Sequence, residues 1–314
     1  MKQICIVPKG LEDQAIKEIK GKVVIPGRVL TENVDINTVQ SAMKVYEYWG
    51  QGKVSDLIKW IDGDIKDFFK VYDIKGKVKI DCHREGEHDF ISVDVERKFA
   101  NELLSKGYQI DMKSSDMVIF VDIINDDYIY GLDLTPKLLS KRDYRIKIHK
   151  QSINACIAYC LVRLSEWKKG ILLDPFCKDG IIPIEAAIYR EGDVIGYDSL
   201  FHNVRSSEIN CKLSEVDVKF ARFDASWLDT RFDDINTIIS AVPFPSKTIS
   251  EGKIKFIYQE LFKALKETLS GKAVFIAPTV SLLKDVASDY DFKLVEERVT
   301  FMGKAEFRVV VFKL

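Results

Sequence analysis

The chain of 314 residues has little of what marks membrane, secreted or metal-binding proteins. No apolar run approaches the roughly 18 residues that a membrane-spanning helix needs, and residues 1–8 are too short and too polar at their borders for a signal peptide. The six cysteines form no Cys-x-x-Cys pair, and no histidine stands at zinc spacing from them. We therefore expect a cytoplasmic protein that holds no metal and contacts no membrane.

An excess of charge of one sign is missing as well. The chain has 47 Lys and Arg against 48 Asp and Glu, which gives a net charge of −1 at pH 7. The protein as a whole therefore does not attract a polyanion, and any nucleic-acid site must be a local basic patch. The length and the hydrophobic fraction of 46% suffice for a sizeable core spread over two or three domains.

Residues 151–314 alternate short apolar segments with helical patterns, which predicts a mostly parallel α/β sheet with right-handed crossovers. A helix is expected over 151–167. The expected strands are 171–173, 193–197, 219–222, 237–240, 272–277, 292–297 and 307–312. Only the short connection 298–306 joins the last two strands, so we expect them to form an antiparallel edge pair.

The region before this sheet is predicted to hold two α+β units. We expect a small ferredoxin-like unit over 1–65, with strands at 3–7 and 23–25 and helices at 11–19 and 34–48. A second unit is expected over 66–135. Its expected elements are a strand at 77–83, a helix at 92–106 and a hairpin of 116–123 with 128–133. A basic linker over 136–150 completes the predicted organisation.

The linker carries a basic cluster with one aromatic residue in its middle, namely Lys141, Arg142, Tyr144, Arg145 and Lys147. Cationic side chains of this kind contact RNA phosphates, and an aromatic ring can stack on an exposed base. We predict an RNA contact here. A solvated charged linker is an equally open interpretation of the same residues.

Residues 170–187 combine an apolar strand, a turn with Gly180 and a helix that starts near Pro183. Open α/β sheets bind nucleotide-like ligands at such turns, at the carboxyl end of a strand. Glycine allows a close backbone approach, and the first turn of the helix offers free N–H groups to an anion. One turn of this kind is common to many α/β folds.

The segment 174–187 also resembles motif I of S-adenosylmethionine-dependent RNA and DNA amino-methyltransferases, through Asp174-Pro175-Phe176-Cys177, Gly180 and Ile184-Glu185-Ala186-Ala187. Residues 83–90, 130–133 and 139–145 are similar to a THUMP domain. Together they resemble the THUMP-containing tRNA guanine-N2 methyltransferases of archaea. The resemblance implies a Rossmann-like methyltransferase domain behind a THUMP domain over 66–135, with S-adenosylmethionine as cofactor and tRNA as partner. Some relatives are thought to need a small activating protein subunit.

The resemblance also assigns roles to single residues. Those expected to bind the cofactor are Asp174, Phe176, Gly180, Asp198 and Asp224. Asp198 would bind the ribose hydroxyls from the end of the second strand, and Asp224 would contact the adenine amino group. A carboxylate at the end of that strand is also what ribose recognition requires geometrically.

The catalytic loop is expected at 238–246, with Ala241, Pro243 and Phe244 at the functional positions. In the family, a side-chain acid or amide and a loop carbonyl accept hydrogen bonds from the exocyclic amine of the target base. The aromatic ring stacks on that base. Here Ala241 stands at the acid or amide position, and Val242 and Pro245 also depart from the pattern.

Motif I is altered too, because Lys178 and Asp179 replace Gly and Ser. A lysine at a turn position built for glycine is expected to face a positive φ and to point toward the methionine moiety. Two functions follow from the sequence. One is a tRNA guanine-N2 methyltransferase, and the alternative is a catalytically degenerate RNA-binding relative.

Overall fold

The computed structural model describes residues 1–57 and 75–314. Within them, the chain divides into two compact units. Unit 1 comprises residues 1–6, 19–39 and 44–138, and unit 2 comprises 7–18, 40–43 and 139–314. The expected boundary between residues 65 and 66 lies outside the described residues.

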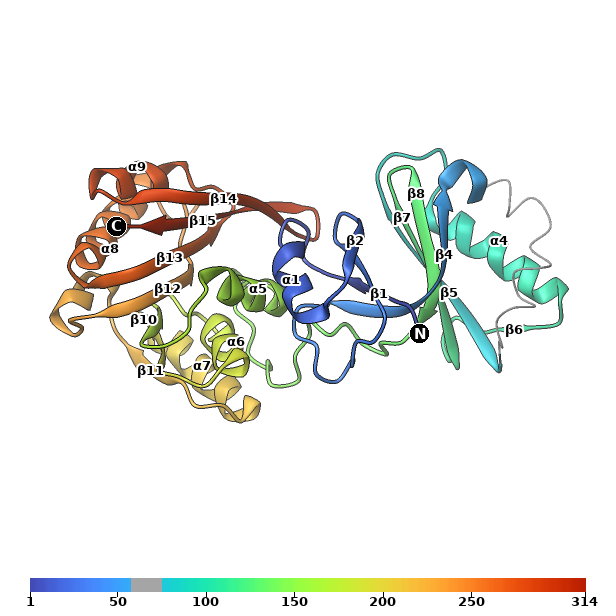
Figure 1. Ribbon diagram of the computed structural model, residues 1–314, viewed down its shortest axis with the longest axis horizontal. Coiled ribbons are helices and arrows are strands. Elements are labelled where there is room, and N and C mark those ends of the chain that lie inside the picture. The colour runs from blue at the N-terminus through green and yellow to red at the C-terminus, as the bar shows by residue number, and fades with distance from the viewer. Residues whose placement is uncertain (58–74) are drawn as a thin grey trace. The chain divides into compact units, whose positions relative to one another are not determined.

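Unit 1 is built on an eight-stranded sheet in the order β2-β3-β1-β4-β8-β7-β5-β6 (Figure 1). Its strands are β1 (Gln3–Ile6), β2 (Lys22–Ile25), β3 (Arg28–Thr31), β4 (Lys44–Lys53), β5 (Lys77–Glu85), β6 (Gln109–Ile110), β7 (Met117–Ile124) and β8 (Asp127–Asp133). Helix α4 (Ser92–Ser105) packs on β5, and its Phe99 and Leu103 side chains are fully buried in the core. The hairpin β7–β8 is antiparallel, as the sequence predicts.

One predicted element of unit 1 is wrong. The helix expected over 34–48 does not form, because residues 32–43 hold only turns and bends and β4 begins at Lys44. The aromatic and β-branched residues Val45, Tyr46 and Tyr48 favour a strand. Tyr46 is fully buried between neighbouring strands, with its ring 5.1 Å from that of Phe120.

Unit 2 contains a seven-stranded sheet in the order β11-β10-β9-β12-β13-β15-β14. Its strands are β9 (Leu172–Asp174), β10 (Val194–Asp198), β11 (Lys219–Arg222), β12 (Ile235–Ala241), β13 (Leu269–Ala277), β14 (Lys293–Met302) and β15 (Ala305–Lys313). The first five strands in this order pair in parallel, and β15 pairs antiparallel with both β13 and β14. The expected mostly parallel sheet with an antiparallel edge pair is confirmed.

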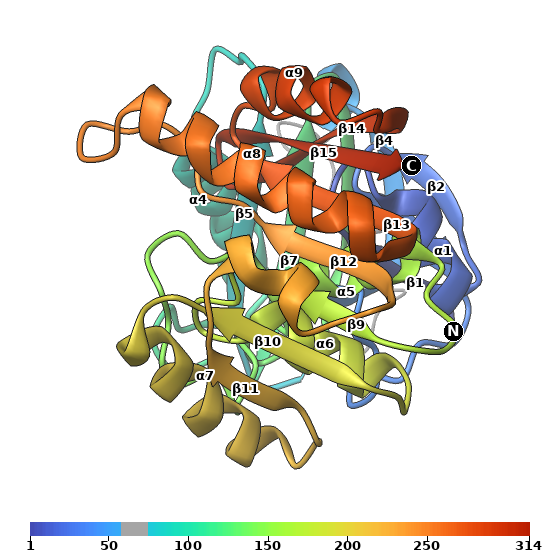
Figure 2. The ribbon, with the colours of Figure 1, turned by 90° about the vertical axis from the view of Figure 1, so that its left-hand side faces the viewer.

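Helices cover both faces of this sheet (Figure 2). The helices of unit 2 are α1 (Glu12–Ile19), α5 (Ala155–Ser165), α6 (Ile181–Tyr189), α7 (Phe201–Ser214), the 3-10 helix η2 (Ala225–Thr230), α8 (Glu251–Thr268) and α9 (Ser281–Asp289). Helix α5 packs against α6, whereas α8 packs against α9 and η2 on the other face. On the α8 face, the Phe262 ring lies 5.0–5.9 Å from the rings of Phe275, Phe292 and Phe312.

The strand order reverses between β9 and β12. From β9 the chain builds outward through β10 to β11, and it then returns to lay β12 and β13 on the other side of β9. Loops that leave the carboxyl ends of β9 and β12 therefore diverge, and ligands of open α/β sheets bind in the crevice between such loops. The fold thus directs attention to the residues that follow Asp174, Asp198 and Ala241.

Candidate functional site

The turn between β9 and α6 is tightly wound. Lys178 has φ = 53° and Gly180 has φ = 80°, and the Gly180 N–H donates to the Cys177 carbonyl at 2.8 Å. A Cβ atom added to Gly180 would lie 2.9 Å from the Ser207 Cβ, so this position requires glycine. The positive φ expected at Lys178 is confirmed, and this conformation costs a residue with a side chain on the order of 1 kcal/mol.

The Lys178 side chain turns into the protein at the carboxyl edge of the sheet. Its ammonium group donates to the Ala241 carbonyl at the end of β12, and its backbone N–H donates to the Asp198 Oδ2 atom at 3.1 Å. Only 8% of the residue is exposed. Burial lowers the pKa of Lys178, while Asp174, Asp198 and Asp179 raise it, and burial prevails. One lysine therefore joins the ends of β9, β10 and β12.

Asp174 ends β9 and is also buried. Its Oδ1 atom accepts hydrogen bonds from the Ser240 hydroxyl at 2.5 Å and from the Phe176 N–H at 3.1 Å. Burial raises the pKa of Asp174 to about 7, against the lowering effect of these bonds and of Lys178. The half-buried Phe176 side chain packs on the hydrophobic core beneath the sheet edge.

Asp198 and Asp224 stand at the ends of neighbouring strands in different surroundings. The Asp198 Oδ1 atom accepts from the Leu200 N–H at 2.9 Å and from the Asn203 amide at 3.0 Å, so most of its acceptor capacity is used inside the protein. Asp224 is exposed and caps η2 through the Ser226 N–H at 3.0 Å. Its second oxygen has no hydrogen bond within the described part of the chain, so it can receive a ligand.

The loop after β12 brings the expected catalytic residues to this same edge. Ala241 is buried, whereas Pro243 and Phe244 are partly exposed. The Tyr258 hydroxyl of α8 donates to the Pro243 carbonyl and fixes the loop. Beside the loop lies a hollow of about 250 Å³. Its lining residues are Pro245, Glu251, Tyr258, Thr279, Ser281, Leu282 and Asp285. Sequence reasoning did not identify the two carboxylates, Glu251 and Asp285, in this hollow.

The basic segment before α5 contacts α6 and the turn that precedes it. The Arg142 guanidinium donates to both carboxylate oxygens of Glu185, at 2.8 and 3.1 Å, and the Tyr144 hydroxyl donates to Glu185 at 2.5 Å. Burial and the Glu185 charge raise the pKa of Tyr144. Arg145 binds the Asp179 carboxylate at 2.7 Å, and Ser152 donates to the same carboxylate at 2.6 Å.

Arg142, Tyr144 and Arg145 thus have partners within the protein, and their contact with RNA stays a prediction. Both arginine side chains are only 9% exposed, and their carboxylate partners are fully buried. A phosphate would have to compete with a buried ion pair for either guanidinium group. By contrast, Lys141 and Lys147 are exposed, so phosphate contact stays a prediction for these two residues. The sequence contained the partners Asp179 and Glu185 but no signal that pairs them with the basic segment.

The comparisons with known proteins agree with this architecture. The sequence model of the family described as "RMKL-like, methyltransferase domain" matches residues 142–306. The chain belongs to this methyltransferase family. A tRNA (guanine(6)-N2)-methyltransferase of Methanocaldococcus jannaschii is 31% identical over 278 residues, which cover 72% of this chain and 73% of the relative.

Two solved methyltransferase structures share the fold over nearly the whole chain. The crystal structure of TrmN from Thermus thermophilus superposes with a TM-score of 0.79 at 22% identity, covering 99% of both chains. A putative methyltransferase solved in complex with SAH gives a TM-score of 0.76 at 16% identity, covering 99% of this chain and 97% of the other. At these identities the likeness concerns the fold alone.

Two kinds of feature are absent from the described residues. Within residues 1–57 and 75–314, no helix has both the length and the apolar character that crossing a bilayer requires. In the same residues, no group of three or more His, Cys, Asp or Glu side chains is arranged to hold a metal ion.

Replacing Asp174 by Asn should change how the stability of this methyltransferase domain depends on pH. The pKa of Asp174 is raised from 3.8 to about 7 in the folded protein. The free energy of unfolding of the wild type therefore falls as the pH rises from 3.8 to about 7. We expect Asp174→Asn to gain roughly 3 kcal/mol relative to wild type between pH 5 and pH 8, measured by urea unfolding. The exposed Asp229→Asn serves as control. Parallel curves for wild type and Asp174→Asn would contradict the raised pKa.

Replacing Glu185 by Gln should destabilise the protein strongly. The change removes the charge that compensates the buried Arg142 guanidinium, and breaking a buried pair in this way costs on the order of 3–5 kcal/mol. Urea or thermal unfolding measures the loss, and the exposed Glu191→Gln is the matched control. A loss no larger than that of the control would show that the Arg142–Glu185 pair does not hold the segment in solution.

Proposed function

We propose that the chain is an S-adenosylmethionine-dependent tRNA methyltransferase that acts on the exocyclic N2 of guanine. The observation that carries the proposal is the sheet edge at the reversal of the strand order, where Asp174, Asp198 and the Ala241 carbonyl meet around one buried cation. The methyltransferase family, and the relatives named tRNA (guanine(6)-N2)-methyltransferase, support the choice of donor and acceptor.

The residues at this edge suit a nucleoside donor. The exposed Asp224 carboxylate is open to an adenine amino group, and Asp198 retains acceptor capacity for a ribose hydroxyl. Asp174 offers a carboxylate to the cationic part of the ligand. When bound, S-adenosylmethionine supplies an electrophilic methyl group.

The chain's own contribution to the transfer is positioning. A carbonyl at the end of β12 can accept a hydrogen bond from the target amine, and the partly exposed Phe244 ring can stack on a base extracted from the RNA. Because Ala241 has no side-chain acceptor, one positioned hydrogen bond is missing. By analogy with deletions of single hydrogen bonds in other active sites, this costs on the order of 10²–10³ in rate, so we expect a slow enzyme.

A second candidate function is favoured by the contact between Lys178 and Ala241. The lysine ammonium occupies the carbonyl that the target amine would use, and it places a positive charge where a cationic donor must enter. A chain locked in this state would bind RNA without transferring a methyl group.

We further propose that a THUMP domain over 66–135 and the exposed Lys141 and Lys147 contact the tRNA. The linker over 136–150 and the methyltransferase domain over 151–314 complete this division of the chain. A tRNA-modifying enzyme of this kind would work in the cytoplasm. Methyl transfer by the purified chain would show that no activating subunit is needed.

Titration of S-adenosylmethionine into the purified protein tests the proposed function directly. We expect calorimetric binding in the micromolar range and transfer of labelled methyl to guanine N2 of unmodified tRNA transcripts. Asp198→Ala should abolish both, because it removes the carboxylate at the end of β10. The absence of donor binding at millimolar concentration, together with unlabelled tRNA, would overturn the assignment.

The variant Lys178→Met distinguishes the two candidate functions. Like charges a few ångströms apart repel by roughly 4 kcal/mol even when partly screened, so removing the ammonium should tighten donor binding at least about tenfold. Neutral methylthioadenosine should bind wild type and variant alike, and Lys247→Met in the exposed part of the loop should change neither ligand. Tight donor binding by wild type that Lys178→Met leaves unchanged would show that the lysine does not obstruct the site.

A further inference from the structure

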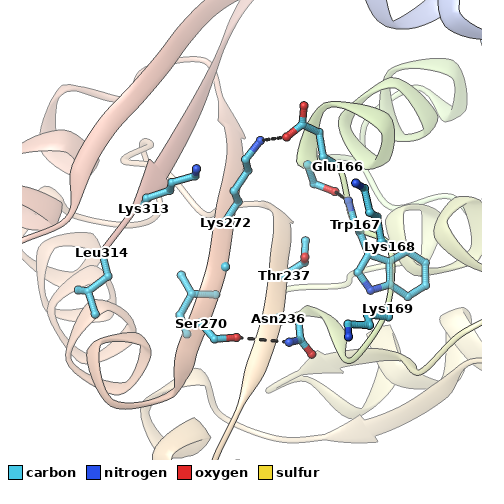
Figure 3. A pocket seen from close by; sticks show the side chains of 13 residues that line it. Glu166, Trp167, Lys168, Lys169, Asn236, Thr237, Ser270, Lys272, Lys313 and Leu314 are labelled. Atoms are coloured by element: carbon cyan, nitrogen blue, oxygen red, sulfur yellow. Dashed lines mark hydrogen bonds and ion pairs between the residues drawn. The ribbon is translucent and has the colours of Figure 1, made fainter.

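A second hollow lies at the opposite edge of the unit 2 sheet, where β9, β12 and β13 begin and β15 ends (Figure 3). Its volume is about 610 Å³. The loop after α5 supplies one wall with Lys168 and Lys169, while β13 and β15 supply Lys272 and Lys313 on the other side. The length of the strands therefore separates this hollow from the carboxyl edge of the sheet, where Asp174, Asp198 and Ala241 lie.

The charge of this hollow is strongly unbalanced. Four lysines line it with a single acidic side chain, Glu166, which pairs with Lys272 (Figure 3). Within residues 1–57 and 75–314, Lys168, Lys169 and Lys313 form no ion pair, and all three are exposed. The hydrogen bond from Lys272 lowers the pKa of Glu166, and the charges of Lys17 and Lys168 lower it further.

The positive surface continues into a smaller hollow of about 170 Å³ that shares Glu166, Trp167 and Lys168 with the first. Lys17, Arg163 and Arg190 join there, and both guanidinium groups lie about 5.2 Å from the centre of the Tyr189 ring. The Arg163 Nε atom is buried and has no hydrogen-bond partner in the described structure. Neither arginine has a carboxylate partner among the described residues.

Local structure explains only part of this arrangement. Lys168 and Lys169 follow the C-terminal end of α5, where positive charge complements the helix dipole. That effect does not account for Lys313 at the end of β15 or for Arg190 after α6. In a protein of net charge −1, we therefore treat these seven cations as one surface, the basic edge: Lys17, Arg163, Lys168, Lys169, Arg190, Lys272 and Lys313.

We propose that the basic edge binds the phosphate backbone of the RNA substrate, at a distance from the target base. This inference rests on the proposed function. The cations are spread over two adjoining hollows and several elements, which matches successive phosphates of a chain. Among the lining residues Glu166 is the only one with an acidic side chain, which favours a polyanion over a protein surface of mixed charge. An anchor on this edge adds affinity for RNA and leaves the donor site untouched.

The test compares Lys168→Ala/Lys169→Ala with the control pair Lys253→Ala/Lys255→Ala. The control removes the same charge from exposed positions on α8, outside both hollows. Binding of a fluorescent tRNA transcript to the full chain is measured by anisotropy at several salt concentrations. We expect the first pair to weaken binding about tenfold at low salt and to reduce the slope of log K against log salt by about one to two, since each phosphate contact contributes roughly 0.7–0.9.

Binding of S-adenosylmethionine should be the same in both pairs. An equal loss in the control pair, or an unchanged salt slope in the first pair, would overturn the inference while leaving the proposed function intact. Wild-type protein that binds no tRNA at any salt concentration would overturn the proposed function itself. Inorganic triphosphate is included as competitor. Saturation of the hollow by triphosphate, with no effect of the first pair on tRNA binding, would assign the hollow to a free phosphate ligand and overturn the RNA contact.

Discussion

Asp179 in the turn between β9 and α6 and Glu185 within α6 are buried carboxylates that need positive partners, and the segment before α5 supplies these partners. Asp179 and Glu185 are both fully buried, and leaving either charge without its partner would cost on the order of 3–5 kcal/mol. Arg145 and Arg142 meet them from the segment before α5. This pairing fixes the segment on α6 and on the turn.

The turn between β9 and α6 also determines which groups lie at the carboxyl edge of the sheet. In this turn the backbone at Lys178 is left-handed, and the lysine side chain reaches the Ala241 carbonyl at the end of β12. Lys178 thus has two effects. It links the ends of three strands, and its positive charge opposes the entry of a cationic ligand. A substitution at a single motif position therefore reshapes the site without altering the order of the strands.

Much of this could be predicted from sequence because the signals are local. The strands of unit 2, the turn with Gly180 and the antiparallel edge pair follow from periodicity and short connections, which need no knowledge of distant partners. The failure at β4 has the same origin, since the spacing over 34–48 was compatible with a helix until pairing with β1 and β8 decided otherwise. The roles of Arg142 and Arg145 depend on residues about 40 positions away, and the basic edge gathers side chains from residue 17 to residue 313. No local pattern links such positions.

The path of the chain has a consequence for how the protein can be divided. The backbone passes between units 1 and 2 five times, because residues 7–18 and 40–43 belong to the methyltransferase unit although they lie within the N-terminal region. These short segments are tied in by specific bonds: the Gln40 carbonyl accepts from Arg142, and the Ala42 carbonyl accepts from the Cys156 thiol. A fragment starting near residue 139 would lack the carbonyl groups that accept these hydrogen bonds from Arg142 and Cys156. Unit 2 therefore takes its full set of contacts from three separate stretches of the chain and not from its C-terminal part alone.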